Sequence, residues 1–572
     1  MSQKACVFCF FCFLLPILSS AQNRYDVIIN EFLPDPTPSR GLPESEFIEV
    51  KNRSPRDFNL RNWKISNGTT TGTIKTDYVL KSDSFLILCA SASASSFSPF
   101  GSTIGVSGFP ALINDGGEIS ISSDLGEVIH AIKYDKSWFK NDLKAEGGWS
   151  LEMIDPSKFC LGKENWSASV SDSGGTPGHI NSVDAINPDK EMLALSRAVV
   201  TDSVNLNLLF NEPVDSASGA NNFNYFISDG VGNPDSAFTT APFFDQVSIK
   251  LQNPISAGKI YTISLQQVED CKGEEIGLNN ICKLGLPKKA KAGDIIFNEI
   301  LFNPPPYGYD YLELFNRSSS VIRCSELFVA GINADGSLNT PTALVKDERD
   351  FFPGEYLLLT ENPSWVLQNY PEADSSQILS ISSLPSMPDD IGKVAILNSE
   401  GFILDELDYD HHWQSPLLTT ESGVALERID PDLPTSLASN WTSAAASAGY
   451  GTPSYKNSES YTDSVFTHFI SIDPKIFSPD MDGYNDFCYI NYHLSQSGYM
   501  GSISIYDING RMVRRLVNNE IWATEGIFRW DGLDDQQNLL PMGHYMIYTE
   551  LFLLDGSVKK NLSVCVLARK AH

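Results

Sequence analysis

The chain has 572 residues, with 71 acidic and 41 basic side chains and a formal net charge of −30 at pH 7. A surface this acidic repels nucleic acid and anionic membranes, so we expect neither as a partner. Divalent cations are the only partners that the charge favours, and the simplest interpretation of the acidity is solubility outside the cell.

The first 21 residues have the pattern of a secretory signal peptide. Lys4 precedes an almost entirely apolar run from Ala5 to Leu18, which is followed by small residues up to Ala21. We predict cleavage after Ala21. The apolar run is too short to span a bilayer comfortably, and no other segment approaches the ~20 residues required. We therefore expect an exported protein without a transmembrane segment, in the medium or on the outer cell surface.

Strand-forming segments follow one another along the rest of the chain. Short runs rich in Val, Ile, Phe, Tyr and Thr alternate with clusters of Gly, Pro, Asn, Asp and Ser, as at residues 26–29, 47–50 and 85–88. Helical periodicity is not sustained over ten residues. The length suggests roughly four domains. The pattern predicts an all-β protein of tandem immunoglobulin-like β-sandwich domains.

One set of short motifs occurs twice in the same order. The first set is Ile29-Asn30-Glu31-Phe32-Leu33, Glu49 to Ser54, Leu151 to Pro156, Asn165-Trp166 and Gly175-Thr176-Pro177. The second set is Phe297-Asn298-Glu299-Ile300-Leu301, Glu313 to Ser318, Leu426 to Pro431, Asn440-Trp441 and Gly451-Thr452-Pro453. We therefore predict two copies of one domain, at residues 25–180 and 292–454. A residue that differs between the copies cannot serve a function that both share.

Two further domains and two polar linkers complete the predicted organisation. Residues 191–286 form an insert between the copies, and residues 465–572 form a final domain. In the final domain, alternating residues 502–505 lead into Asn509-Gly510, a pair that favours the positive φ angles of a tight hairpin turn. Residues 181–190 and 456–464 are predicted to be polar linkers.

These motifs resemble known families. Both copies resemble the lamin tail domain, an immunoglobulin-like β-sandwich, through Asn-Glu, the Glu49 and Glu313 segments and Gly-Thr-Pro. The insert resembles bacterial Ig-like domains of surface proteins, through residues 210–214 and 270–273. The final domain resembles C-terminal modules of proteins exported by type IX-secreting bacteria, and the Ig-like domain of flagellar hook-capping proteins, through residues 477–486 and 530–532. The resemblance implies surface location and a secretion machinery as partner of the final domain, but no single activity.

An acidic segment of the final domain is a candidate calcium site. Asp480, Asp482, Asn485 and Asp486 bunch three carboxylates and one amide around Gly483. Calcium takes six to eight oxygen ligands, which carboxylates and amides supply. The spacing departs from that of an EF-hand, and an ordinary acidic turn before a strand remains the alternative. We expect no other cofactor.

Three of the ten cysteines lie in the predicted signal peptide, which leaves an odd seven. Export permits disulfides. Cys271 and Cys282 flank a short polar loop and are the best candidate pair, and Cys488 could also meet Cys565. Spacing proves neither pairing.

Two candidate catalytic or metal-binding segments differ between the two copies. The loop Asp172-Ser173-Gly174-Gly175 resembles a serine nucleophile loop, but the second copy has no serine there. Asp410-His411-His412-Trp413 aligns with residues 135–138, which lack histidine, and adjacent histidines on a strand would point to opposite faces.

Three glutamates recur in both copies, as the pairs Glu31/Glu299, Glu49/Glu313 and Glu152/Glu427. With the recurring asparagines and with Arg53 or Arg317, we interpret them as a hydrogen-bonded network that holds the edge of the sandwich. We therefore expect no enzyme, but a structural, adhesive or scaffolding protein with an extracellular protein or glycan as partner. The alternative is a glycan-binding or hydrolase-associated protein.

Overall fold

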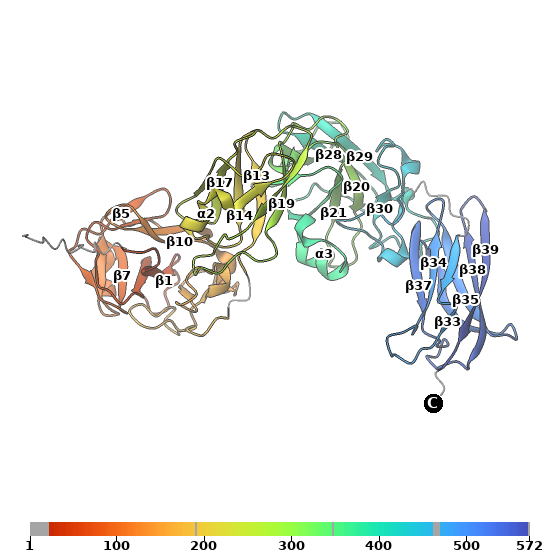
Figure 1. Ribbon diagram of the computed structural model, residues 1–572, viewed down its shortest axis with the longest axis horizontal. Helices are drawn as coiled ribbons and strands as arrows, with labels where there is room; N and C mark the ends of the chain where they lie inside the picture. The colour runs from red at the N-terminus through yellow and green to blue at the C-terminus, as the bar shows by residue number, and fades with distance from the viewer. Residues whose placement is uncertain (1–21, 189–191, 346–347, 461–468, 570–572) are drawn as a thin grey trace, which may run out of the picture. The chain divides into compact units, whose positions relative to one another are not determined.

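The computed structural model describes residues 22–188, 192–345, 348–460 and 469–569. The predicted signal peptide and its cleavage after Ala21 lie outside this part. Strands dominate the described residues, and the three α-helices among them are short: α1 (Ala94–Phe97), α2 (Ser216–Gly219) and α3 (Pro363–Asn369) (Figure 1). The all-β prediction is confirmed. Within the described ranges, no helix has the length and apolar character needed to cross a membrane.

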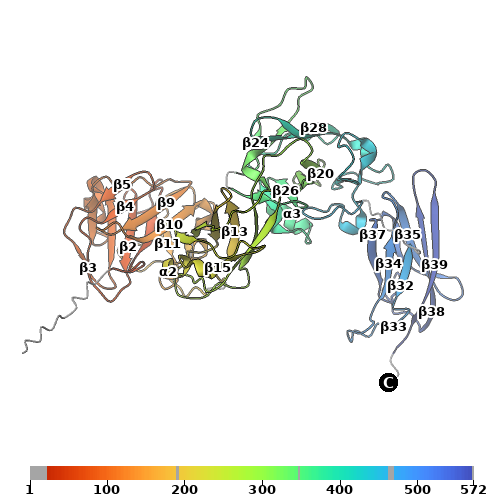
Figure 2. The same ribbon diagram turned by 45° about the horizontal axis from the view of Figure 1, so that its top comes forward.

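The chain divides into two compact units, the first comprising residues 1–254 and 261–284, the second residues 255–260 and 285–572. The first sandwich lies in unit 1. Its six-stranded sheet has the order β12 (Trp166–Ala168), β11 (Leu151–Met153), β1 (Val27–Leu33), β2 (Phe47–Asn52), β7 (Phe85–Ala90) and β8 (Thr103–Val106). The four-stranded sheet has the order β10 (Val128–Asp135), β9 (Gly116–Ser122), β4 (Lys64–Ser66) and β5 (Thr71–Thr73), and β3 (Phe58–Asn59) pairs with β6 (Val79–Leu80). Figure 2 labels strands of both sheets, β2 and β11 in one and β4, β5 and β9 in the other. A buried apolar core that includes Ile29, Trp63 and Ile121 joins the two sheets.

The second sandwich lies in unit 2 and has the same strand order. Its six-stranded sheet runs β31 (Trp441–Ser443), β30 (Leu426–Arg428), β20 (Ile295–Leu301), β21 (Tyr311–Asn316), β26 (Tyr356–Thr360) and β27 (Ile378–Ser380). The four-stranded sheet runs β24 (Thr342–Ala343), β23 (Leu327–Gly331), β28 (Ile391–Asn398) and β29 (Ile403–Asp410), and β22 (Ile322–Arg323) pairs with β25 (Asp350–Phe351). In both sandwiches the pair opposite the β12 or β31 edge, β7–β8 or β26–β27, is parallel. The sequence duplication is therefore a duplication of strand order and direction.

A β-bulge recurs at the same place in both six-stranded sheets. The β1–β2 register shifts between Ile29 and Glu31, and the β20–β21 register shifts between Phe297 and Glu299. The bulged residues are Asn30 and Asn298. A bulge leaves one residue unpaired and re-aims its neighbours, so a polar side chain that makes its own hydrogen bonds suits this position.

The remaining strands form two smaller sandwiches. In the insert, a sheet of β13 (Leu195–Val200), β14 (Asn205–Phe210), β17 (Gln246–Lys250) and β16 (Ser236–Thr239) accompanies β15 (Tyr225–Ile227), β18 (Ile260–Leu265) and β19 (Ile281–Gly285). In the final domain, β32 (Ile470–Asp473), β34 (Cys488–His493) and β37 (Glu525–Trp530) form one sheet. The other has the order β33 (Ile476–Phe477), β39 (Val558–Leu567), β38 (Gly543–Phe552), β35 (Met500–Tyr506) and β36 (Met512–Ile521).

Candidate functional sites

Three glutamates form a row across the six-stranded sheet of the first sandwich. Glu31 on β1 is the cross-strand partner of Glu49 on β2 and of Glu152 on β11. Directly opposed residues in antiparallel strands have Cβ atoms about 4.5–5.5 Å apart. All three side chains are 0% exposed. The recurring glutamates therefore do converge, but beneath the surface.

The segment that follows β12 covers this row and supplies most of its hydrogen-bond donors. The backbone N–H of Thr176 donates to Glu31 Oε1 at 2.8 Å, and its hydroxyl donates to Glu152 Oε1 at 2.9 Å. The Ser182 hydroxyl donates to Glu152 Oε2 at 2.7 Å. Asn181 donates its side-chain N–H groups to the carbonyls of the bulged Asn30 and of Met153. The Gly-Thr-Pro motif recurs because it begins the segment that seals the carboxyl groups.

The second sandwich repeats this arrangement. Glu299 is the cross-strand partner of Glu313 and Glu427, and all three are 0% exposed. Thr452 donates its backbone N–H to Glu299, and its hydroxyl lies 2.7 Å from Glu299 Oε2 and 2.8 Å from Glu427 Oε1. Asn457 donates to the carbonyl of Asn298 at 3.0 Å. One hydroxyl hydrogen cannot serve two carboxylates, so one of these glutamates must itself carry a proton.

Burial raises the pKa of Glu31, Glu49, Glu299 and Glu313, and neighbouring carboxylates raise it further. The pKa of Glu49 rises to about 7 and that of Glu299 to about 8, in both cases mainly because burial disfavours the charged form. The pKa values of Glu31 and Glu313 lie well above the usual range for the same reason. Around neutral pH each row of glutamates therefore retains protons. These protons reduce the repulsion between the carboxyl groups, so no bound cation is needed to balance it.

The prediction that Arg53 and Arg317 belong to this network is wrong. Arg53 Nη1 donates to the carbonyl of Tyr25 at 3.2 Å, and Arg317 donates to the carbonyls of Gly293 and Pro431. Both arginines follow the last residue of their strand, so their side chains leave the face that carries the glutamates. The network is closed by hydroxyl, amide and backbone donors, and the predicted asparagines belong to it.

The loop at Ser173 is a glycine-rich turn. The Ser173 hydroxyl donates to the carbonyl of Gly175 at 2.9 Å and lies 2.8 Å from the Ser171 hydroxyl, and Gly174 has a φ of +86°. These contacts engage the serine in its own turn.

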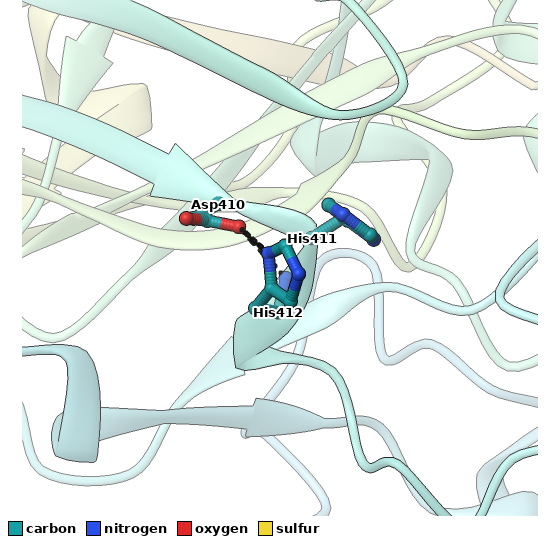
Figure 3. Close-up of side chains that lie close together, drawn as sticks. All are labelled: Asp410, His411 and His412. Carbon is teal, nitrogen blue, oxygen red and sulfur yellow. Dashed lines mark hydrogen bonds and ion pairs between the residues drawn. The ribbon is translucent and has the colours of Figure 1, made fainter.

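Asp410, His411 and His412 lie close together at the end of β29 (Figure 3). The histidines begin the 3-10 helix His411–Trp413, and their ring centroids are 4.1 Å apart. The expectation that they point to opposite faces of a strand is therefore wrong, because they lie in a turn. His411 Nδ1 is 3.0 Å from Glu421, and His412 Nδ1 is 2.7 Å from Asp410. Carboxylates therefore already engage one nitrogen of each ring, and the first copy has no histidine here.

The predicted calcium ligands lie on the loop between β33 and β34. A carboxylate oxygen from each of Asp480, Asp482 and Asp486 lies within 4.8 Å of the other two. The backbone carbonyl of Asn485 accepts the Ser478 N–H at 2.8 Å. The three aspartates are thus brought together, whereas Asn485 is engaged through its backbone within the loop.

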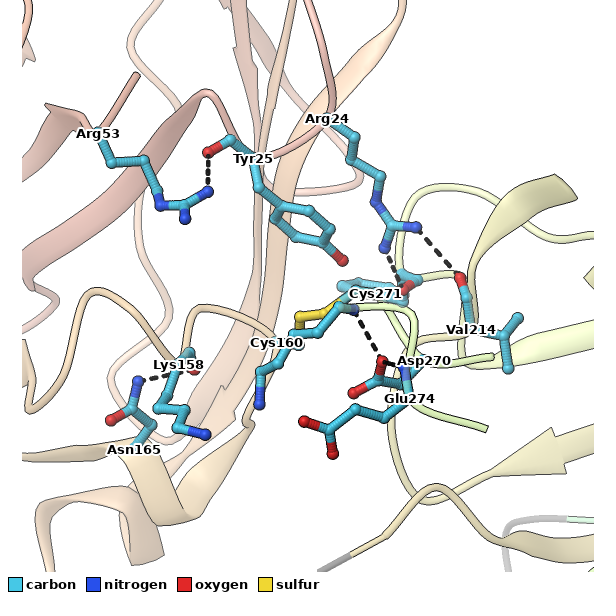
Figure 4. The surroundings of a disulfide bond; sticks show 12 residues. Arg24, Tyr25, Arg53, Lys158, Cys160, Asn165, Val214, Asp270, Cys271 and Glu274 are labelled. Atoms are coloured by element: carbon cyan, nitrogen blue, oxygen red, sulfur yellow. Dashed lines mark hydrogen bonds between the residues drawn. A yellow bond between two sulfur atoms is a disulfide. The ribbon is translucent and has the colours of Figure 1, made fainter. Parts of the chain in front are cut away.

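The disulfide joins Cys160 to Cys271, with Cα atoms 6.4 Å apart (Figure 4). The predicted Cys271–Cys282 pair is therefore wrong. Cys282 has a free thiol on β19, with Sγ 3.7 Å from the carbonyl of Leu195. Next to the disulfide, Arg24 donates to the carbonyls of Val214 and Phe243 in the insert. The bond therefore ties the first sandwich to the insert instead of closing a loop within the insert.

Two other cysteines meet inside the final domain without forming a disulfide. Cys488 and Cys565 are both free and 0% exposed, and a hydrogen bond with Cys565 raises the pKa of the Cys488 thiol. The expectation that they approach one another holds, and they remain thiols.

None of the nine tryptophans is exposed. Trp63, Trp138, Trp166, Trp441, Trp522 and Trp530 are buried, and Trp149, Trp365 and Trp413 are half-buried. Trp149 is further covered by Arg40 and Lys144, whose cationic groups lie 4.5 and 4.2 Å from its ring. Core packing accounts for most of the aromatic content.

Comparison with curated proteins gave no match. Several solved structures show local similarity. FLGD from P. aeruginosa is 25% identical, with 14% of this chain and 62% of that chain covered and a TM-score of 0.13. A DUF4876 family protein from Bacteroides thetaiotaomicron is 10% identical, and the match covers 33% of this chain and 78% of that chain with a TM-score of 0.19. PorZ, a surface component of the type-IX secretion system of Porphyromonas gingivalis, is 9% identical. The match covers 92% of this chain and 74% of that chain with a TM-score of 0.16.

These TM-scores are too low to support any functional argument, and the chain spans less than two thirds of FLGD. The family comparison is more specific. It matches residues 20–136, which include β1 to β10, and stops before β11 and β12, which complete the six-stranded sheet. This first part of the chain matches the family described as Lamin Tail Domain.

Proposed function

We propose that the chain is an exported, non-catalytic protein of the outer cell surface or the medium, with a structural, adhesive or scaffolding role. Two lamin-tail-like sandwiches carry a bacterial Ig-like domain between them, and the final domain serves export or attachment. One observation carries the proposal. The groups that both copies share and that could perform acid–base chemistry are 0% exposed beneath a covering segment. A substrate would have to displace that segment to reach them.

The position of the recurring groups supports a load-resisting role. Each row of glutamates fastens the end of a sandwich onto its own central strands by several hydrogen bonds to charged or shared-proton carboxyl groups. Such bonds contribute roughly 1.5–3 kcal/mol each when charge is involved. Rigid sandwiches with firmly attached ends suit a protein that spans distance or bears force outside the cell.

A fractionation and protease-shaving experiment tests the location. An epitope inserted at the exposed turn around Leu125, which is 79% exposed, should leave the core of the first sandwich intact. We expect the tagged full-length chain in the surface or medium fraction, with the tag removed from intact cells by added protease. A chain lacking residues 465–572 should stay inside the cell. Protection of the full-length tag in intact cells would contradict the proposal.

A pocket in the second sandwich favours glycan binding as the second candidate function. It has a volume of about 380 Å³ and is lined by Tyr309, Asp310, Glu361 and residues 384–388. Tyr309 is 39% exposed. Burial, then the nearby Asp389 and Glu361, raise the pKa of Asp310 to about 7. An exposed aromatic ring beside hydrogen-bonding carboxyls is a combination that can hold a sugar ring.

Glycan binding can be separated from a purely structural role. The mature chain and the variant Tyr309→Ala would be applied to a glycan array. Binding by the native chain that the variant loses at least tenfold would favour this candidate. A native chain that binds no glycan would leave the structural role as the better account.

A further inference from the structure

The acidic loop of the final domain, residues 478–487 between β33 and β34, has the geometry of a cation site. Asp480, Asp482 and Asp486 each present a carboxylate oxygen within 4.8 Å of the other two. Asp482 Oδ1 also accepts the Tyr484 N–H at 2.9 Å, and Asp486 Oδ2 accepts the Gly483 N–H at 2.8 Å. These backbone bonds restrict the orientations of two of the three carboxylates.

Asp486 provides an independent indication of a ligand. Its side chain is only 9% exposed, and its Oδ1 atom is buried without a hydrogen-bond partner. A buried carboxylate oxygen costs free energy when nothing replaces its lost water. One carboxylate oxygen of Asp486 lies within 4.8 Å of oxygens of Asp480 and Asp482, so a cation bound at this cluster would lie beside the carboxylate that carries the unpartnered oxygen.

We propose that this loop binds calcium. Carboxylate oxygens are hard ligands that favour calcium or magnesium over zinc and copper, which prefer imidazole or thiolate. Calcium accepts six to eight oxygens in a flexible arrangement, whereas magnesium demands a near-ideal octahedron and keeps several waters. A short loop with three converging carboxylates meets the looser requirement, and backbone carbonyls or water would supply the remaining ligands. Bound calcium would fasten the exposed part of the loop to Asp486, two residues before β34.

Titration of the full mature chain tests the site directly. After treatment with a chelator, the protein would be titrated with CaCl₂ by calorimetry and with Tb³⁺ by luminescence, which Tyr484 in the loop can sensitise. We expect one saturable site, with a Kd at or below about 1 mM, the weak end of the range for extracellular modules. We expect Asp482→Asn and Asp486→Asn each to weaken binding by about tenfold or more, because ligand charge sets the affinity.

A matched control is available in the same domain. Asp555 accepts the Ser557 N–H at 2.8 Å in an exposed turn, the same local bond that Asp482 makes, but it lies outside the cluster. Asp555→Asn should therefore bind calcium within about twofold of the native chain. Circular dichroism would establish that each variant folds, and Asp480→Asn offers an exposed replacement if Asp486→Asn does not.

Three results would overturn the proposal. They are the absence of a saturable site, equal binding by the native chain and by folded Asp480→Asn and Asp482→Asn variants, or magnesium binding as tight as calcium binding. None of these results bears on the surface role proposed above, which the fractionation experiment decides separately.

Discussion

Replacing Glu31 with glutamine should raise the thermal unfolding midpoint at pH 8 and leave it nearly unchanged at pH 5. Glu31 Oε1 accepts hydrogen bonds from the Ser150 hydroxyl and the Thr176 N–H, whereas Oε2 is buried without a partner. Glutamine keeps the accepting oxygen and replaces the other with a neutral amide. The variant therefore resembles the protonated side chain at every pH.

The direction of the pKa shift determines whether stability rises or falls with pH. The pKa of Glu31 lies well above 4.5 in the folded protein because of burial and of Glu49 and Glu152 nearby. Below about pH 4.5 both folded and unfolded states hold the proton, and the stabilisation is fully present. As pH rises, the unfolded chain loses its proton first, so stability falls by up to about 1.4 kcal/mol per pH unit for each such group. For Glu49 and Glu299, whose pKa values rise to about 7 and about 8, this loss begins near pH 4.5 and is complete above those values.

The measurement is urea or thermal unfolding of the mature chain at both pH values. Glu127→Gln is the matched control, since Glu127 is exposed in a turn of the same sandwich and should respond equally at pH 5 and pH 8. Glu31→Ala should cost about 3 kcal/mol or more at either pH, because it leaves the buried donors of Ser150 and Thr176 unsatisfied. Equal destabilisation by Glu31→Gln at pH 5 and pH 8 would mean that Glu31 is ionised in the folded protein.

The sequence predicts the network because the duplication shows which polar residues recur. Asn30 and Asn298 mark the bulge, and Thr176 and Thr452 mark the covering segment. The polar composition predicts linkers around Asn181 and Asn457, but both are buried and hydrogen-bonded to the bulged asparagines of the two sandwiches. The sequence does contain a pattern that marks these two asparagines. In both copies an Asn-Ser pair follows Gly-Thr-Pro at the same spacing. A polar composition alone cannot distinguish a solvated linker from a segment whose side chains are hydrogen-bonded inside.

Other features depend on contacts that no local pattern contains. The direction of Arg53 depends on where β2 ends, one residue earlier, and an end position is the least certain property of a predicted strand. The Asn509-Gly510 turn does join β35 to β36, but only Gly510 has a positive φ, so the loop is wider than the two-residue turn expected. The Arg511 carbonyl accepts the Asp507 N–H across it. Turn residues therefore predict the place of a hairpin better than its type.

The partner of Cys271 could not be predicted from spacing. Cys160 lies 111 positions earlier, in a different sandwich, whereas Cys282 lies only eleven positions later. Pairing by proximity in sequence assumes that the bond closes a local loop. Here Cys271 faces the first sandwich from a loop of the insert, so the docking of two domains selects its partner.

Removing the disulfide between Cys160 and Cys271 should greatly lower the free energy of unfolding. The double variant Cys160→Ser and Cys271→Ser opens a loop of 111 positions. In the chain-entropy account a bond across about 100 residues stabilises by roughly 4.7 kcal/mol, and measured losses for native bonds are about 2–5 kcal/mol. We expect a loss in that range by urea unfolding, and a similar loss for the native chain in a reducing agent.

Cys282→Ser supplies the control for this experiment, because the Cys282 thiol is half-buried and unbonded. Its stability should stay close to that of the native chain, and its non-reducing digest should still contain the peptide pair that carries Cys160 and Cys271. A digest with Cys271 joined to Cys282, or a double variant as stable as the native chain, would contradict the assignment. Because the reducing agent acts only on the bond, agreement between chemical reduction and the double variant would attribute the lost stability to the crosslink and not to altered side-chain packing.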